Sequence, residues 1–487
     1  MSASPQQART LAVWTVAGTR PALGQPASRP DLICLGALLV LTALLPARTG
    51  QASGFMTARF GGEHGHAASD DPSSLYYNPG ALGLIQDTRI SLEGIVALRN
   101  AQFERASSDQ PEPEGAEGAN VGRSSLRNVL GGPALFAATR LGDLSLAAGL
   151  FAPFGGQNAW DPNPDFEGDP DFPGAVDGVA RWHIISGRMA SIYGSLGAAW
   201  SWPDAGLSLG LSGSLVHTSL STLRARNAFG TDDISREGRP LEGRSLIEVD
   251  GLHGAFGAGL SWEAAPGSLW LGASYQSRPG LQDLVLEGTM ETTLPGVTSS
   301  PTPIDLHMGL PDVLRTALRY RPSKGWEMRL FGDYTRWSVH ERNCASGEGR
   351  SCEVQPDGAP VEGANVLQNQ ERRWRDAFGV RAGLSHWTRP WLELFAGAGY
   401  DGNAVPASTL DPSMMDGHDL SGSAGTRLML PAGMGLALSY TQMVFLPRDT
   451  RGESELAALA APSSVPGAGG RYEQWAGLVF AQLSVAL

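Results

Sequence analysis

Apolar and polar positions alternate with a period of two along most of the chain from residue 89 onward. In "LSLGLSGSLVHT", Leu207, Leu209, Leu211 and Leu215 fall on one face, and small or polar residues fall on the other. The same pattern recurs in "LSLAAGL", "SLWLGASY", "WEMRLFGDYT" and "MGLALSYTQMV". Because successive side chains of a strand point to opposite faces, this pattern predicts β-strands with one fatty face and one polar face.

The segments between these strands come in two lengths that take turns along the chain. Six are short turns built from Gly, Pro, Asp and Ser, such as Gly142-Asp143 and "PSKG" at 322–325. Seven are long polar stretches, near residues 105–130, 155–180, 229–243, 280–303, 342–370, 402–417 and 447–470. This count predicts 14 strands, with both ends of the strand-forming part on the short-turn side. Short turns at one rim and long loops at the other are typical of outer-membrane barrels.

A membrane barrel explains the outward fatty face physically. Hydrocarbon offers no water to satisfy backbone N–H and C=O groups, so a sheet in a bilayer must close on itself. A soluble β-sandwich is the alternative, but it turns its fatty face inward and spaces its turns more evenly. Several candidate strands, such as residues 181–202, exceed the ~9–11 residues that span a bilayer. The expected fold class is therefore all-β, an antiparallel transmembrane β-barrel.

The N-terminus carries an export-like segment. Residues 32–47, "LICLGALLVLTALLPA", fit the apolar region of a signal peptide, and small residues follow at 50–52. We therefore expect residues 1–52 to be a lead and signal peptide. A single membrane anchor is the alternative, and the cleavage site and true start codon stay open. No later stretch is apolar for long enough to predict a membrane-spanning helix.

Composition narrows the choice of partners. The formal net charge is −13, charged residues make up only 17% of the chain, and the one lysine is Lys324. This balance argues against nucleic acid as a partner. Cys344 and Cys352 lie close together in "NCASGEGRSCEV", which suggests a local disulfide in an exported chain. A metal site is the alternative, but two thiols without nearby histidines are weak evidence for one.

The stretch "GHAASDDPSSLYYNPGALGL" at 65–84 does not fit the barrel pattern. It is too broken for a long helix and too poor in alternation for a strand. A barrel of 14 strands has a lumen too wide for its own side chains to fill, because about eight strands is the filled limit. An irregular segment is tolerated at membrane depth when protein or water surrounds it. Such a stretch could therefore block the pore.

The segment "SGFMTARFGGEHGHAASDDPSSLYYNPGALGL" resembles the N-terminal region of the FadL/TodX (OMPP1) family of outer-membrane transporters for fatty acids and hydrocarbons. The resemblance rests on Ser53-Gly54-Phe55, on Asp70 or Asp71, and on Asn78-Pro79-Gly80-Ala81, whose last two residues are swapped relative to the family's usual order. It continues through "GLFAPFGG", "LGASYQSRPGLQDLVLEGTM" and "LPDVLRTALRYRPSKGWEMRLFGDYTRWS", and covers roughly residues 53–487.

The resemblance implies a 14-stranded barrel with a small N-terminal hatch inside the lumen. The expected division is residues 1–52 as signal region, 53–88 as hatch and 89–487 as barrel. Asp70, Asn78 and Pro79 then belong to the hatch motif, where Asn and Pro more simply shape a turn than touch a ligand. The resemblance also implies a kinked wall near residues 149–156 with a sideways exit into the bilayer. An ordinary transition from strand to loop is the alternative there.

Six apolar residues are candidates for a hydrophobic ligand site. Phe55, Met56 and Phe60 open the expected hatch, and their alternative role is to anchor it to the barrel wall. The other three candidates are Phe151, Phe154 and Trp160, which surround a Pro and two Gly that interrupt a strand pattern. The acidic loop at 160–178 could attract divalent cations, although its spacing matches no known calcium loop.

We found no sequence pattern typical of a catalytic, metal or phosphate site, and expect no enzyme activity, cofactor or metal. The expected function is passive uptake of hydrophobic small molecules, such as long-chain fatty acids, across the cell outer membrane. The partners are then the ligand, outer-membrane lipid and lipopolysaccharide, and the expected state is a monomer. The alternative is a surface adhesin or structural barrel that does not transport. The ligand's identity stays open.

Overall fold

The computed structural model describes residues 59–487. The signal region, Phe55 and Met56 lie outside the described residues. Among the described residues, no helix is both long enough and apolar enough to cross a membrane.

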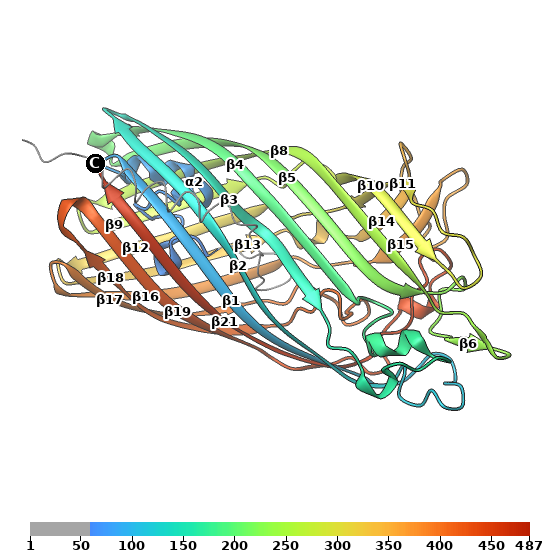
Figure 1. The fold of residues 1–487 in the computed structure, drawn as a ribbon. Helices are drawn as coiled ribbons and strands as arrows, with labels where there is room; N and C mark the ends of the chain where they lie inside the picture. The colour runs from blue at the N-terminus through green and yellow to red at the C-terminus, as the bar shows by residue number, and fades with distance from the viewer. Residues whose placement is uncertain (1–58) are drawn as a thin grey trace, which may run out of the picture. The chain divides into compact units, whose positions relative to one another are not determined.

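Fourteen antiparallel strands form a closed barrel in which every strand pairs with two neighbours, and the last strand pairs with the first from Arg89↔Ala486 to Arg105↔Gly470. Figure 1 shows these strands side by side, tilted in the same sense. They are β1 (Arg89–Arg105), β2 (Gly122–Leu141), β3 (Leu144–Ala159), β4 (Ser186–Trp202), β5 (Leu207–Arg226), β8 (Gly243–Ala265), β9 (Leu269–Gln276), β12 (Val313–Ser323), β13 (Trp326–Thr335), β16 (Ala377–Arg389), β17 (Leu392–Asp401), β18 (Asp419–Met429), β19 (Met434–Phe445) and β21 (Gly470–Ala486).

The expected fourteen-stranded barrel, with six short turns and seven long connections, is confirmed. Both ends of the strand-forming part lie at the short-turn rim, where the N–H of Leu487 donates to the carbonyl of Thr88. Two short 3₁₀ turns shape connections at this rim, η5 (Pro203–Ala205) between β4 and β5 and η7 (Pro431–Gly433) between β18 and β19. A third, η6 (Trp337–Val339), follows β13 at the other end of the wall. Others lie in the long connections: η3 (Pro164–Phe166), η4 (Pro173–Asp177) and η8 (Leu456–Ala458).

The fatty face of the strands points outward, as the alternation predicts. The side chains of Leu211 and Leu215 are 67% and 66% exposed, whereas Ser208 and Ser212 on the opposite face are buried. Exposed aromatic residues lie at both ends of this apolar band: Trp202, Trp262, Trp326 and Trp391 near the short turns, and Tyr334, Phe378 and Trp475 near the long loops. Such belts are typical of the two interfaces of a membrane.

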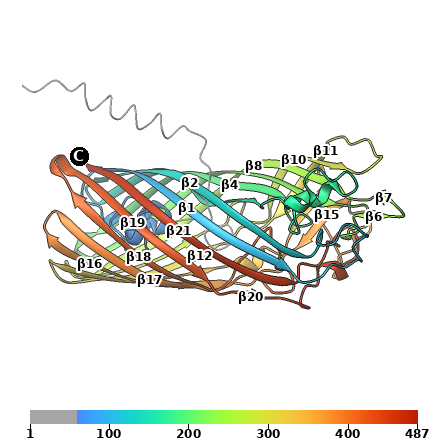
Figure 2. The same cartoon turned by 60° about the horizontal axis from the view of Figure 1, so that its bottom comes forward.

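Two of the expected long loops contain strands that sequence alternation did not reveal. These are β10 (Leu284–Thr293), β11 (Thr302–Met308), β14 (Arg342–Gly347) and β15 (Val366–Glu371). β10 pairs with the outer part of β8 at residues 244–250, and β11, β14 and β15 follow in order. Figure 2 shows this outer sheet at the end opposite the short turns. Its formation pairs the part of β8 that β9 does not reach, which would otherwise be a free edge.

Three smaller strands complete the long loops. β6 (Ser235–Arg236) and β7 (Arg239–Pro240) form a separate hairpin, and β20 (Arg448–Asp449) pairs with β21. These short pieces stabilise loops rather than the barrel wall.

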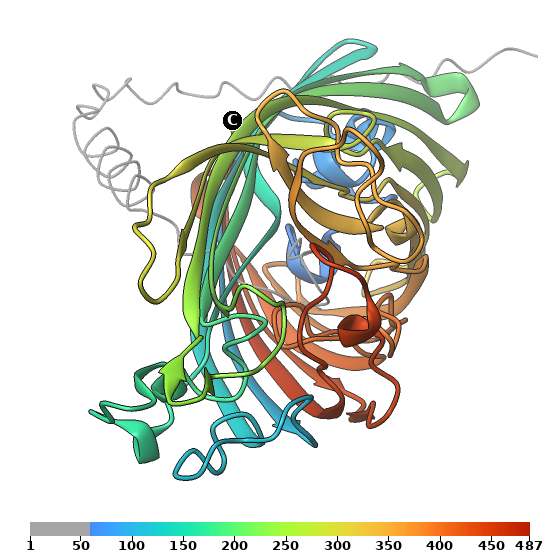
Figure 3. The same ribbon diagram turned by 90° about the vertical axis from the view of Figure 1, so that its right-hand side faces the viewer.

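The N-terminal segment, defined here as residues 59–88, packs against side chains that face the barrel interior. It contains η1 (Gly62–His64), α2 (Ser74–Tyr77) and η2 (Pro79–Leu84), which appear in blue within the ring of strands in Figure 3. Asn78 caps η2, because its side chain accepts a hydrogen bond from the N–H of Gly80 at 2.9 Å, and Pro79 occupies the first helical position. Their role in shaping a turn therefore accounts for both residues.

Candidate ligand-binding site in the barrel lumen

Polar contacts hold the N-terminal segment to several strands at once. His64 lies 2.7 Å from Glu393 on β17, and Asp70 pairs with Arg319 on β12 at 2.9 Å. The Asn78 amide donates to the carbonyls of Ala67 at 2.5 Å and Leu260 at 2.8 Å. The segment is therefore tied to β8 and β17 by hydrogen bonds, which are costly to leave unmade, and to β12 by an ion pair.

Aromatic packing anchors the same segment to the opposite part of the wall. The ring of Phe60 lies 5.6 Å from that of Phe136 on β2 and 5.3 Å from that of Phe151 on β3. Tyr76 of the segment contacts both Phe60 and Phe151. Phe60 and Phe151 are thus brought together, and the contacts of Phe60 are those of an anchor. Aromatic pairs of this geometry stabilise by about 0.5–1.5 kcal/mol beyond their buried area.

Phe154 connects β3 with a distant part of the barrel. Its ring lies 6.4 Å from Tyr193 on β4 and 6.5 Å from Trp337, which lies between β13 and β14. Trp337 in turn contacts Trp374 at 4.8 Å. Phe154 therefore belongs to an aromatic bridge across the lumen. Trp160 lies elsewhere, near Phe103 of β1, so the structure does not bring it together with Phe151 and Phe154.

The β2–β3 ladder ends part-way along both strands. The register between them runs only from Leu141↔Leu144 to Leu135↔Leu150. Beyond it, the pairing of β3 with β4 continues, with an irregularity between Phe151 and Phe154 where β3 carries one extra residue. The two strands meet again at the Asn128 amide, which donates to the carbonyl of Gln157 at 2.6 Å. We call this interval, residues 126–134 of β2 and 151–156 of β3, the ladder break.

A cavity lies in the outer half of the lumen, lined by side chains from strands and long connections. One part of its lining is apolar, formed by Ile184, Met189, Leu220, Ile247, Leu306 and Met414. The other part is polar and includes Asn158, His183, Gln368 and Arg372. Gly156, beside the ladder break, is also part of the lining. The cavity therefore suits an amphiphile better than a purely apolar or purely polar molecule.

The polar end of the cavity carries more positive than negative charge. Arg372 pairs with Asp411 at 2.8 Å, so these two charges offset each other. Arg224 lies on the inward face of β5, two residues beyond Thr222, which lines the cavity. The guanidinium of Arg224 is buried, and within residues 59–487 it forms neither an ion pair nor a hydrogen bond. An unpaired buried charge is costly unless a ligand completes it.

His183 stays neutral beside these charges. Burial lowers the pKa of the imidazole to about 4, Asp411 opposes the change, and Arg105, Arg224 and Arg372 add to it. Neither ring nitrogen has a hydrogen-bond partner in the described part of the chain, and Nδ1 is 3.9 Å from the Asp411 carboxylate. Burial alone would raise the pKa of Asp411, but Arg372 and His183 hold it below its ordinary value. At neutral pH the polar end therefore offers a neutral imidazole and an unpaired guanidinium.

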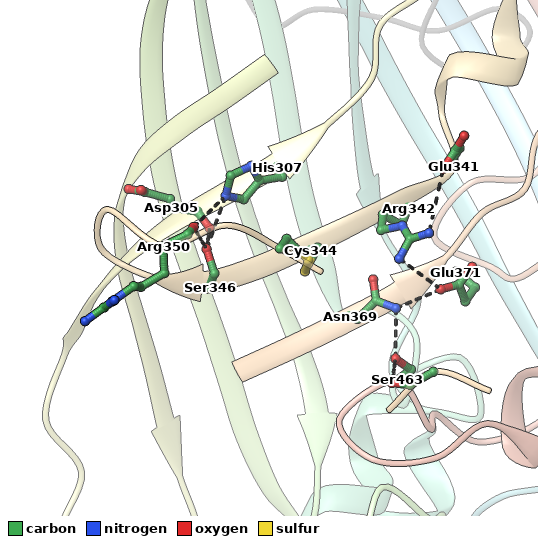
Figure 4. Close-up of a disulfide and its surroundings, with 12 residues drawn as sticks. Asp305, His307, Glu341, Arg342, Cys344, Ser346, Arg350, Asn369, Glu371 and Ser463 are labelled. Carbon is green, nitrogen blue, oxygen red and sulfur yellow. Dashed lines mark hydrogen bonds and ion pairs between the residues drawn. A yellow bond between two sulfur atoms is a disulfide. The ribbon is translucent and has the colours of Figure 1, made fainter. Parts of the chain in front are cut away.

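Cys344 and Cys352 form a disulfide at the outer sheet, away from this cavity. Figure 4 shows its surroundings, where Ser346 donates to the carbonyl of Arg350 at 2.7 Å. The bond ties β14 to the loop that follows. In the acidic loop 160–178, as in the rest of residues 59–487, no group of three or more His, Cys, Asp or Glu side chains is arranged to hold a metal ion.

Comparison with known proteins places the chain in a family. The family model for the outer membrane protein transport protein (OMPP1/FadL/TodX) matches residues 43–444. The chain belongs to this family. Members of the OMPP1/FadL/TodX family are transport channels of the outer membrane, so this chain is an outer-membrane β-barrel of a transport family. No curated protein matches it.

Solved structures agree with the fold of an OMPP1/FadL/TodX protein. A Pseudomonas aeruginosa FadL homologue is 14% identical, with a TM-score of 0.72, over 89% of this chain and all of that chain. The Pseudomonas putida toluene transporter TodX is 15% identical (TM-score 0.59, 90% and 99% covered). The Ralstonia pickettii toluene transporter TbuX is 16% identical (TM-score 0.56, 89% and 98% covered). Identity at this level supports the architecture alone.

Sequence reasoning missed the polar end of the cavity of this OMPP1/FadL/TodX protein. Arg224 and Arg226 stand at alternate positions of "LSTLRAR", so the pattern could have placed them on the polar, inward face of a strand. His183 and Arg372 lie in connections between strands, where no periodic signal indicates a direction. Their meeting with Arg224 depends on how the loops fold over the lumen.

Replacing Asn78 by Ala is expected to weaken the docking of the N-terminal segment by about 3 kcal/mol, because buried hydrogen-bonding groups on Ala67, Gly80 and Leu260 lose their partner. Protease cleavage within residues 59–88 of the detergent-purified barrel measures this, and we expect faster cleavage. Gln86→Ala is the matched control, since this exposed amide donates only to the carbonyl of Leu84 within the segment and has a single long contact with the wall, 3.5 Å from Arg140. Equal cleavage rates for the two variants contradict the assignment.

Proposed function

We propose that this protein admits hydrophobic small molecules with an anionic head group, such as long-chain fatty acids, by passive diffusion across the outer membrane. The outer loops capture the ligand, the lumen cavity holds it, and movement of the N-terminal segment opens the path onward. No catalytic step or cofactor takes part.

The apolar lining of the cavity supplies the main driving force of capture. Removing apolar area of a ligand from water yields roughly 25 cal/mol per Å². One side of the cavity is an apolar surface built by side chains from different strands and loops, namely Ile184, Met189, Leu220, Ile247, Leu306 and Met414. A barrel that served only as an adhesin or a structural protein would have no use for such a cavity beneath its loops. The cavity is the observation that carries the proposal.

Arg224 supports an anionic head group. Its guanidinium is buried without a partner near His183, and a carboxylate would give it a charge-assisted hydrogen bond. The neutral His183 adds a donor at the same end. A neutral hydrocarbon, of the kind named for the toluene transporters TodX and TbuX, would leave this charge unpaired. The residues of this chain therefore favour a carboxylate over an aromatic hydrocarbon.

The ladder break supports a sideways exit. Gly156 lines the cavity and also lies in the ladder break, so the cavity and this part of the wall adjoin. Between residues 126–134 and 151–156 the wall lacks the continuous backbone pairing that seals the rest of the barrel. A greasy ligand that leaves through this interval enters the bilayer without crossing water.

The charge of Arg224 provides the test. Arg224→Gln is expected to weaken dodecanoate binding about tenfold, because a hydrogen bond to a charged group contributes about 1.5–3 kcal/mol. Binding of 1-dodecanol, which has the same chain and no charge, is expected to stay within about twofold. Isothermal titration of the purified barrel in detergent measures both affinities.

Arg226→Gln is the matched control, because it removes the same charge from a guanidinium already bonded to Gln368 and the carbonyl of Leu367. Dodecanoate binding that is unchanged in Arg224→Gln overturns the anionic head group. Failure of wild-type protein to bind either probe overturns the cavity as the ligand site.

A further inference from the structure

Two outward-facing arginines flank the ladder break on the outside of the barrel. Arg127 on β2 and Arg188 on β4 are both exposed, and both stand on the face that also carries Val129 and Ile192. In the part of the chain that the structure describes, neither arginine forms an ion pair or a hydrogen bond. Two other outward arginines in the outer half of the wall do have acidic partners, Arg123 in Glu104 at 3.2 Å and Arg471 in Glu473 at 2.6 Å.

Both arginines lie just beyond the apolar band. Val129, 59% exposed, is two residues from Arg127 on the membrane side, and Ile192, 43% exposed, is four residues from Arg188. In the strand register, Asn100 pairs with Arg127 on one side and with Trp475 on the other. Trp475 belongs to the outer aromatic belt, and such belts mark the level of the lipid head groups. The arginines therefore reach the head-group layer of the outer leaflet.

One strand separates the two arginines. Gln157 of β3 is the register partner of Arg188, and its carbonyl accepts the Asn128 amide next to Arg127. Because Asn128 contacts Gln157 and Gln157 pairs with Arg188, the two arginines flank β3 at the same level, and their long side chains can converge over it. On the side of β1, the acidic Glu104 pairs with Arg123; on the other side, Glu248 and Asp250 stand on β8, two strands beyond Arg188. The Asp250 carboxylate already has a partner, because Nε2 of His217 lies 3.1 Å from it.

We propose that Arg127 and Arg188 together bind a phosphate of the phosphorylated sugar head group of an outer-leaflet glycolipid, seated over the outer end of the ladder break. The charges are complementary, since a guanidinium presents a planar fork of donors that matches phosphate oxygens. The height of the two arginines also fits such a lipid. With its head group at their level, its acyl chains lie along the apolar outer face of the barrel. The lipid then covers the interval of wall in which the β2–β3 ladder is interrupted.

This site rests on the chain being an outer-membrane barrel, and does not depend on which molecule the lumen carries. The chain as a whole has a formal net charge of −13, which repels anionic lipid. The two unpaired arginines form a local positive site that attracts the phosphate despite this net charge. Arg188 borders the lumen cavity at its strand position, but its exposed side chain stands on the outward face of β4, whereas Arg224 stands on the inward face of β5.

Native mass spectrometry of the full barrel in detergent, titrated with bisphosphorylated lipid A, tests the site. In the double variant Arg127→Gln/Arg188→Gln, we expect the fraction of barrels that carry lipid A to fall about tenfold, because charge-assisted hydrogen bonds are lost. We expect the same loss for wild-type protein when the lipid A has been dephosphorylated. Mobility of unheated samples in gel electrophoresis shows that each variant has formed its barrel.

Arg123→Gln/Arg471→Gln is the matched control, since it removes two outward arginines that already have acidic partners and changes the net charge equally. Lipid A binding within about twofold of wild type is expected there. Equal loss in both double variants, or no loss in either, overturns the site. Loss of dodecanoate binding in Arg127→Gln/Arg188→Gln also overturns it, because the pair would then serve the transported ligand.

Discussion

Deleting residues 53–84 is expected to turn the closed barrel into an open, weakly selective pore. About eight strands is the limit at which inward side chains fill a barrel, and this wall has fourteen, so the truncated lumen cannot close itself. The deletion also removes the partners of Arg319 and Glu393, which then line a wet passage. Single-channel recordings in planar bilayers measure this, and we expect conductance to rise at least about tenfold.

Arg224→Gln is the control for this recording, because it changes the lumen and leaves the N-terminal segment in place. Its conductance is expected to match that of wild type. The truncated protein must keep the gel mobility of a folded barrel for the comparison to hold. A folded, truncated barrel with wild-type conductance refutes the role of the segment as a hatch.

Removing the extra residue of β3 is expected to stop transport while ligand binding persists. Between Phe151 and Phe154, β3 has one residue more than β4, and Pro153 in this interval has no N–H to donate to a ladder. Deleting Ala152 together with Pro153→Val restores an even register and a donor. β3 can then pair with β2 beyond Leu135↔Leu150 and close the ladder break.

We expect uptake of dodecanoate by cells that rely on this protein to fall at least about tenfold, a barrier increase of about 1.4 kcal/mol. Binding of dodecanoate to the purified variant is expected to stay near the wild-type value, since the lining residues of the cavity remain. Pro153→Ala alone is the matched control, because it keeps the extra residue, and its uptake is expected to stay close to wild type. Wild-type uptake by the variant that lacks Ala152 and carries Pro153→Val would show that ligands leave by another route.

These two experiments separate the closure of the pore from the exit of the ligand. The N-terminal segment is held by Asp70, His64 and Asn78 to strands on one part of the wall, and by Phe60 to the part that carries Phe136 and Phe151. A movement of the segment therefore acts directly on the aromatic residues at the ladder break. Phe151 therefore links the N-terminal segment to the ladder break through its ring contact with Phe60, as the proposed coupling of capture, segment movement and exit requires.

The candidate site shows how far local pattern reaches. Phe60 is predicted as an apolar residue that opens the hatch, and Phe151 and Phe154 as apolar residues beside Gly and Pro. All three join one aromatic cluster in the lumen. Trp160 follows in the same sequence stretch yet packs near Phe103 instead, because β3 ends at Ala159 and the chain turns toward the outer loops. Arg224, His183 and Arg372 had no signal that joined them.

The sequence by itself determined the barrel. Alternation with a period of two is a local property, so Leu209, Leu211 and Leu215 could be assigned to one face without knowledge of any neighbour. Six short turns and seven long connections then set the number of strands, and the unsatisfied edges of a sheet in lipid required closure. The outer sheet of β10, β11, β14 and β15 escaped this reasoning. Its inward face is apolar, with Leu284, Leu286 and Leu306 buried, but three of its strands have only six or seven residues and lie within stretches assigned to polar loops.

Only the tertiary structure decided which part of the lumen is apolar, which part is charged and where the ladder between β2 and β3 is interrupted. Arg224 meets His183 and Arg372 because β5 and two long connections converge over the lumen, and such contacts depend on register and curvature rather than on neighbouring residues. Pro153 indicated an interruption in β3, but the sheet determined that β2, rather than β4, lost its pairing. Long-range packing makes these choices, and no local pattern records them.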